Sequence, residues 1–68
     1  MIDHNDAPRF IVFGVQDDLL IETHTNLVLD AVILCEINSC ADYKARLWDN
    51  VQRRFISQRQ IDYVLQTM

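Results

Sequence analysis

Ser57-Gln58-Arg59-Gln60 opens the stretch that decides the predicted fold, because it fits the capping box of a helix N-terminus. In this motif the Ser57 hydroxyl accepts hydrogen bonds from free amides of the first turn, and the Gln60 side chain reaches back to the serine amide. The apolar residues that follow share one helical face; they are Ile61, Val64, Leu65 and Met68. We predict a helix over about 58–68 that begins at a sharp corner.

The residues before this corner predict a second amphipathic helix, over about 40–55. Ser39 can serve as its N-cap, and Asp42 lies in the first turn, where the helix dipole favours a negative charge. The apolar side chains of this segment fall within one stripe at helical spacing; they are Tyr43, Leu47, Trp48, Val51 and Phe55.

The N-terminal part contains the best strand candidate, residues 9–15 (RFIVFGV), which are rich in β-branched and aromatic side chains and follow Pro8. Residues 19–24 fit either the return strand of a hairpin or a helix capped by Asp17. The segment THTN at 23–26 is a poor helix interior and favours the hairpin slightly, although neither Asn-Gly nor Asp-Gly is present at the turn.

Residues 27–37 (LVLDAVILCEI) form a nearly continuous apolar run, which periodicity alone assigns to neither helix nor strand. The chain contains no Gly or Pro after Gly14, although a meander of tightly turning strands usually needs them. Asn26 can act as an N-cap. The segment is therefore predicted to be a buried central helix, against which the two later helices pack.

The predicted fold class is α+β but mostly helical, with all-α as the alternative. An N-terminal strand or β-hairpin at about 9–24 precedes three helices at about 27–37, 40–55 and 58–68. We predict a flexible N-terminus over 1–8 and a single small domain over 9–68. A chain of 68 residues is near the size at which a core is marginal, so a homodimer is the expected additional source of stability.

The charge is divided along the chain, whose formal net charge is −4. Residues 1–42 carry eight acidic residues and one basic residue, whereas residues 43–68 carry five basic and two acidic residues. Such a division can steer a partner or a second copy. The sequence has no apolar run of membrane-spanning length and no secretory signal, so we expect a cytoplasmic protein without membrane association.

Catalysis is not expected from this sequence. The two cysteines, Cys35 and Cys40, match no zinc spacing or disulfide framework and are expected to be free thiols. His24 could serve as a base for either thiol, but Cys35 lies in an apolar run that keeps a thiol protonated. His4 lies between two aspartates, yet adjacent ligands on a terminal segment rarely converge on a metal. We predict no enzyme activity, catalytic residue, metal site or cofactor.

The remaining features favour an interaction protein. Tyr63 is expected opposite the apolar stripe of its helix, one turn after Arg59, where a cation–π contact can form. Both residue types are favoured at interface centres. The predicted partner-binding residues are Arg59, Tyr63, Arg53, Arg54, Gln58 and Trp48. We predict a small regulatory module that binds and modulates another protein, with inhibition as the expected effect. By analogy of size and composition alone, it is compatible with phage or mobile-element accessory proteins that block a host protein.

The alternative function is transcriptional regulation by a helix-turn-helix over residues 47–66. Residues 58–60 would then open a recognition helix with side chains that read guanine and adenine edges, and Arg53 and Arg54 would contact phosphates. Phe55 stands where this motif usually has glycine, and the acidity of the chain opposes binding to a polyanion. A nucleic acid is therefore the less favoured partner.

Overall fold

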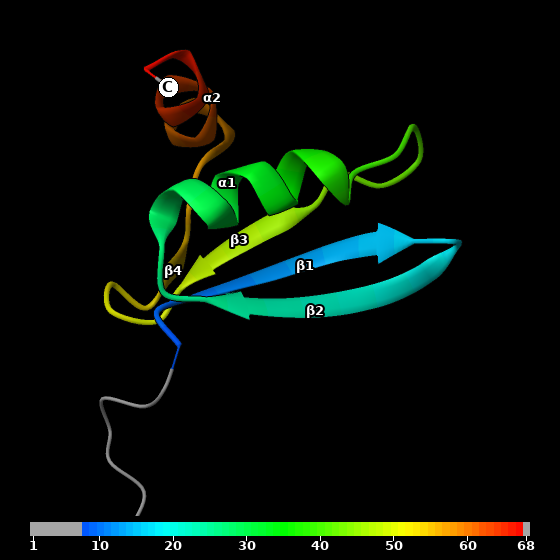
Figure 1. Ribbon diagram of the computed structural model, residues 1–68, viewed down its shortest axis with the longest axis horizontal. Coiled ribbons are helices and arrows are strands. Elements are labelled where there is room, and N and C mark those ends of the chain that lie inside the picture. Colours follow the sequence, from blue (N-terminus) through cyan, green and yellow to red (C-terminus); the bar gives the residue numbers. More distant parts are fainter. Residues whose placement is uncertain (1–7, 68) are drawn as a thin grey trace, which may run out of the picture.

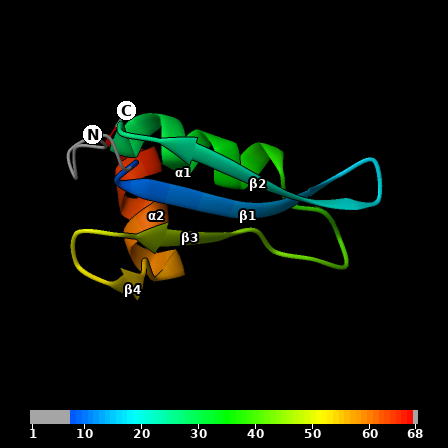
Figure 2. The same cartoon turned by 90° about the horizontal axis from the view of Figure 1, so that it is seen from below.

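The computed structural model describes residues 8–67, which form a four-stranded antiparallel sheet and two helices (Figure 1). The elements in chain order are β1 (Phe10–Gln16), β2 (Leu19–Thr25), α1 (Val28–Ile37), β3 (Arg46–Asp49), β4 (Arg54–Phe55) and α2 (Gln58–Gln66). The strand order is β2-β1-β3-β4, and Figure 2 shows the strands side by side with both helices behind them. The sheet therefore has one face covered by helices and one open face.

The predicted hairpin is confirmed. β1 and β2 pair in an unbroken register from Gln16↔Leu19 to Phe10↔Thr25. The turn is Asp17-Asp18, and both residues have positive φ, 54° and 66°. This is the conformation of a type I′ turn, which suits the twist of a hairpin and which Asp tolerates better than most residues. Two aspartates thus replace the Asn-Gly or Asp-Gly pair that sequence reasoning looked for.

The predicted helix over 27–37 is also confirmed as α1, but its surroundings differ from the prediction. Its N-cap is Leu27, without a side-chain cap, while the Asn26 side-chain oxygen accepts a hydrogen bond from the Arg9 amide at 2.9 Å. α1 lies on the sheet, and only α2 packs against it as a second helix. Its outer side is therefore not sheltered, and Ile37 remains 68% exposed.

The predicted helix over 40–55 is wrong, and with it the expectation of a mostly helical fold with three helices. Residues 46–49 and 54–55 are strands β3 and β4. Burial alternates along this segment, so Ala45, Leu47 and Asp49 are buried on the helix side of the sheet. A half-buried strand is recognised in a sequence by apolar residues at every second position. The buried residue at position 49 is an aspartate, so this alternation could not be seen in the sequence.

Ser39 does not cap a helix. Its hydroxyl donates to the Cys35 carbonyl at 2.7 Å and accepts from the Ala45 amide at 2.8 Å. The residue therefore ties the end of α1 to the start of β3. The helix-turn-helix over 47–66 is not formed, because its first half consists of strands.

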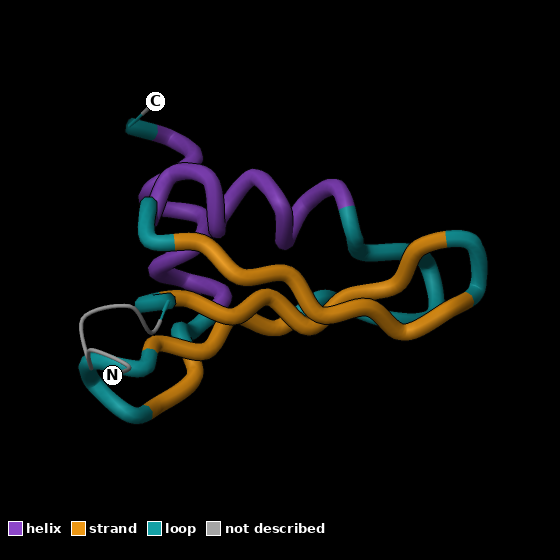
Figure 3. Tube along the Cα trace, turned by 60° about the horizontal axis from the view of Figure 1, so that its bottom comes forward, coloured by secondary structure: helices purple, strands orange, loops and turns teal. Residues whose placement is uncertain are grey.

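The last predicted helix is confirmed as α2, which ends at Gln66. Ser57 is the N-cap, and its hydroxyl accepts from the Gln60 amide at 3.2 Å. Ile61 is buried, and it completes a core of eight hydrophobic residues under both helices; these are Phe10, Val12, Ala31, Val32, Cys35, Ala45, Leu47 and Ile61. Figure 3 shows α1 and α2 on the same side of the strands.

Most of the predicted flexible N-terminus at 1–8 lies outside the described residues, as does Met68. Pro8 is described, and its carbonyl accepts from the Asn50 side-chain amide at 2.7 Å. The helices of the described chain contain ten and nine residues, and neither has the length and apolarity needed to cross a membrane.

Candidate functional site

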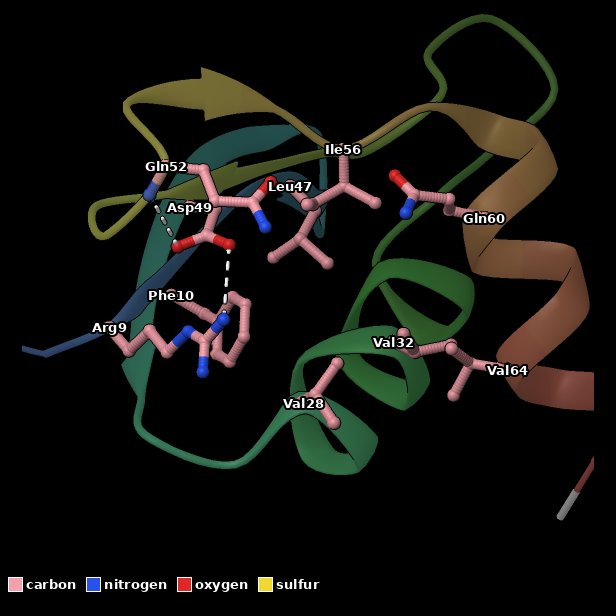
Figure 4. Close-up of a pocket in the computed structure, with 10 residues that line it drawn as sticks. All are labelled: Arg9, Phe10, Val28, Val32, Leu47, Asp49, Gln52, Ile56, Gln60 and Val64. Carbon is pink, nitrogen blue, oxygen red and sulfur yellow. Dashed lines mark hydrogen bonds and ion pairs between the residues drawn. The ribbon is translucent and has the colours of Figure 1, made fainter.

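A cleft of about 210 Å³ opens between the two helices and one end of the sheet (Figure 4). Arg9 and Asp49 form its polar wall, and valines from both helices form its apolar wall. The residues that line it are Arg9, Phe10, Val28, Val32, Leu47, Asp49, Gln52, Ile56, Gln60 and Val64. Because its wall includes a buried carboxylate, this cleft is the first candidate for a catalytic or ligand-binding site.

The Asp49 carboxylate is only 1% exposed and is fully engaged. One oxygen accepts from the amides of Val51 at 2.9 Å and Gln52 at 3.3 Å, and the other lies 3.5 Å from the Arg9 guanidinium. Burial alone would raise the pKa of Asp49, but the two backbone hydrogen bonds and Arg9 outweigh it and hold the pKa below its ordinary value. Asp49 is thus an ionised anchor that holds the β3–β4 loop against the start of β1.

The residues that line the cleft stabilise the fold, and their arrangement does not indicate a ligand-binding site. Its volume lies below the roughly 300–1,000 Å³ of typical small-molecule sites. No buried side-chain polar atom within residues 8–67 lacks a hydrogen-bond partner, so no orphaned group in this part of the chain awaits a ligand. The described residues also contain no cluster of three or more metal-ligating side chains.

The thiol and imidazole considered as a catalytic pair are not brought together. Cys35 is buried between α1 and the sheet. The His24 Nε2 instead contacts the Glu22 carboxylate at 2.6 Å on the exposed strand β2. Burial, with a smaller contribution from the charge of Glu36, raises the pKa of Cys35 to about 11. Cys40 is exposed.

We expect a thiol reagent to modify Cys40 and to spare Cys35 in the folded protein. The raised pKa lowers the thiolate fraction of Cys35 about 100-fold at neutral pH, and burial restricts access further. Pulsed alkylation followed by mass spectrometry of the peptides measures both rates, and a Cys40→Ser variant isolates the buried thiol. Alkylation of Cys35 at the rate of Cys40 without denaturant would contradict this assignment.

A second surface lies on the open face of the sheet, where side chains from three strands meet. The Phe55 ring is the centre of this cluster: it lies 6.3 Å from the Phe13 ring and 5.0 Å from the Trp48 ring, both edge-to-face. The Arg46 guanidinium stacks on it at 3.9 Å from the ring centroid. We call Phe13, Arg46, Trp48 and Phe55 the aromatic face.

The strand register builds the aromatic face. Phe13 pairs with Arg46, and Trp48 pairs with Phe55 across the next two strands. The Trp48 indole N–H donates to the Asn50 side chain at 2.8 Å, which fixes the orientation of the ring. The cluster is therefore a pre-organised set of large side chains, which lose little further freedom on binding.

The surroundings of the aromatic face are basic. Next to Arg46 and Phe55 is a hollow, which is lined by Lys44, Ala45, Arg46, Phe55, Ile56, Gln58 and Ile61. Arg53 and Arg54 follow in the β3–β4 turn and strand β4. Of the acidic residues, Asp17, Asp18 and Glu22 lie in the β1–β2 hairpin, whose strand β2 is the edge opposite to β4.

The predicted site residues fall into three groups. Trp48 belongs to the aromatic face, and Gln58 lines the neighbouring hollow. Arg53 and Arg54 lie at the β3–β4 turn, where the Arg54 Nε donates to Gln52 at 2.9 Å. The other two, Arg59 and Tyr63, lie on α2; Tyr63 is 67% exposed. The cation–π contacts within residues 8–67 are Arg9–Phe10 and Arg46–Phe55, so the expected Arg59–Tyr63 contact is not formed.

Sequence reasoning missed Phe13 and Arg46 as site residues. One signal could have found Phe13, because strand 10–15 is apolar at alternate positions on both sides, which indicates that both faces of the strand require contacts. Arg46 offered no such signal, since its place over Phe55 follows from long-range strand pairing.

Comparison with protein-family models, with curated proteins and with solved structures found no match to this chain.

Proposed function

We propose that this chain is a small non-enzymatic module of the cytoplasm that binds and modulates another protein, using the aromatic face as its contact surface. The observation that carries the proposal is the stacked cluster of Phe13, Arg46, Trp48 and Phe55 on a sheet face that no described element covers. Trp and Arg are enriched among the residues that dominate binding energy, and such residues lie in central, pre-ordered patches.

The basic surroundings define the chemistry of the partner. Arg46 lies at the centre of the patch, and Lys44 lines the adjoining hollow. A partner surface that places an apolar side chain on Phe55 and a carboxylate near Arg46 would complement both features. Blocking such a surface inhibits the partner by steric exclusion, which agrees with the inhibitory role expected from the sequence.

The test compares variants of the aromatic face with a matched control on α2. Arg46→Glu and Phe55→Ala are expected to weaken binding of a captured and purified partner at least 30-fold, since hot-spot side chains contribute about 2 kcal/mol or more. Tyr63→Ala removes an aromatic side chain from α2 that is even more exposed than Phe55, 67% against 40%, and should leave the dissociation constant unchanged. Circular dichroism verifies that each variant folds, and calorimetry measures the constant.

Two outcomes would overturn the proposal. One is a partner whose affinity responds to Tyr63→Ala and ignores Arg46→Glu. The other is tight, salt-sensitive binding of single-stranded DNA or RNA that Phe55→Ala abolishes, because aromatic side chains flanked by arginine also stack on bases. An oligonucleotide titration by fluorescence anisotropy therefore accompanies the protein-binding measurement.

A further inference from the structure

The edge of β2 is open and unprotected. It contains seven residues, Leu19–Thr25, and no other described strand pairs with its outer side. Proteins usually protect such edges with lysine, proline or a bulge. The sequence LLIETHT has neither lysine nor proline, and its register with β1 is unbroken. The other edge strand, β4, has only two residues.

The direction of the free backbone groups on β2 follows from the hairpin. A two-residue type I′ turn is closed by a hydrogen-bonded pair, here Gln16↔Leu19, and bonded pairs alternate along the ladder. Leu20, Glu22 and His24 therefore direct their backbone N–H and C=O groups outward. The same alternation sends the Val15 amide away from β2, and it donates to the Asn38 carbonyl at 2.8 Å.

We propose that two copies of this chain pair antiparallel through the outer edges of β2, with the two-fold axis at Thr23. In this register Thr23 faces Thr23 of the second copy across a pair without backbone bonds. Glu22 of each copy faces His24 of the other across a pair with backbone bonds, and these groups already associate within one chain at 2.6 Å. The result is a continuous eight-stranded sheet.

The paired segment ends at Thr25, because the chain bends at Asn26 before it enters α1. Within this segment, Ile21 of each copy faces Thr25 of the other. Each favourable pair occurs twice because of the two-fold symmetry, so the edge is complementary to itself.

Registers with the axis nearer the turn lack this complementarity. An axis at Glu22 would place the two Glu22 carboxylates directly opposite each other, and like charges at such positions are destabilising. An axis at Ile21 would place Leu20 against Glu22 and leave His24 without a strand partner. The pairing of the Glu22 carboxylate with the His24 ring therefore favours both the second copy as occupant and this position of the axis.

The groove beside the edge suits the same arrangement. A hollow between β2 and α1 is lined by His24, Thr25, Asp30, Ile33 and Leu34. In the paired sheet, Ile21 of the second copy lies opposite Thr25, on the helix side and next to this hollow. Burial of apolar surface here would supplement a core that is small for a stable monomer.

Cysteine scanning in a Cys40→Ser background tests the register. Opposite residues of a pair without backbone bonds have Cα atoms about 4.5 Å apart, within the range of a disulfide. Thr23→Cys is therefore expected to form a covalent dimer under mild oxidation. Glu22→Cys should not, because its equivalent lies on the diagonal, about 7–8 Å away. Thr25→Cys is the same-face control, since its equivalents are farther apart still.

Charge exchange and sedimentation test the association itself. Glu22→Lys and His24→Glu are each expected to weaken the dimer at least 10-fold, and the double variant should restore it, because Lys at position 22 then faces Glu at position 24 of the other copy. A wild-type chain that stays monomeric up to about 1 mM, or preferential cross-linking of Glu22→Cys, overturns the proposal. Arg46→Glu should leave the dimer intact, which separates this interface from the aromatic face.

Discussion

Replacing Asp49 by alanine is expected to lower the free energy of unfolding by about 3–5 kcal/mol. The side chain accepts two backbone hydrogen bonds from Val51 and Gln52 as an ionised, buried acceptor, and a hydrogen bond to a charged group contributes about 1.5–3 kcal/mol. The contact with Arg9 adds little, because that side chain is 47% exposed. Since a domain of this size has only about 3–10 kcal/mol of stability, the variant should be largely unfolded at room temperature in mild denaturant.

Urea titration followed by circular dichroism measures this loss. Asp42→Ala is the matched control, because Asp42 is an exposed loop aspartate whose replacement should change stability by about 0.5 kcal/mol or less. An Asp49→Ala variant as stable as the control would show that the β3–β4 loop does not depend on the Asp49 carboxylate.

The acid dependence of stability has the same origin. The pKa of Asp49 in the folded state lies below its ordinary value, so its contribution is complete above the unfolded pKa of about 4 and is lost as pH falls through the folded pKa. Wild-type protein should therefore lose more stability on acidification than Asp49→Asn, whose amide oxygen can still accept the backbone bonds without titrating. If the free energy of unfolding fell equally with pH in the two proteins, the ionised Asp49 carboxylate would not be the source of the acid dependence.

Replacing Gly14 by alanine is expected to cost about 2–3 kcal/mol, near the upper end for overpacking of a core. A Cβ atom at this position would lie 2.5 Å from the Cβ of Asn38 and 2.9 Å from its carbonyl oxygen. Asn38 cannot retreat easily, because it is buried and its carbonyl accepts from the Val15 amide. The loop after α1 therefore approaches β1 as closely as a glycine permits.

Whether Gly14→Ala raises or lowers the free energy of unfolding shows whether Asn38 blocks a Cβ atom at this position. In a strand interior without a steric obstacle, alanine in place of glycine is stabilising by roughly 0.5–1 kcal/mol. A stability gain for Gly14→Ala in chemical denaturation would therefore show that Asn38 moves aside freely. The variant Gly14→Ala with Asn38→Gly removes one of the two close contacts and should recover part of the loss.

The elements that could be predicted from the sequence are those with local signals. The Ser57 cap fixes the start of α2. The apolar segment after Pro8, followed by the poor helix interior at 23–26, indicates the β1–β2 hairpin. β3 and β4 could not be predicted, because four and two residues are too few to show a period. In addition, β3 pairs with β1, which is distant in sequence. The segment 40–55 also carries an apolar stripe at helical spacing, which favoured the wrong element.

The same distinction applies to the candidate site. Trp48 was predicted because an exposed tryptophan would enlarge the patch expected around Arg59 and Tyr63. Its association with Phe13 and Phe55, and the position of Arg46 over the central ring, depend on the register of three strands. Periodicity in one segment carries no information on that register, so the cluster could be found only in three dimensions.

The unequal edges of the sheet limit how far these chains can polymerise. Pairing of two β2 strands consumes the long edge of both copies and leaves a two-residue strand at either end of the joined sheet. Such a stub offers too few backbone groups to template another molecule, and arginine occupies one of its two positions. In the proposed dimer, assembly would therefore stop at two chains, and growth into fibrils would be disfavoured without any separate protective segment.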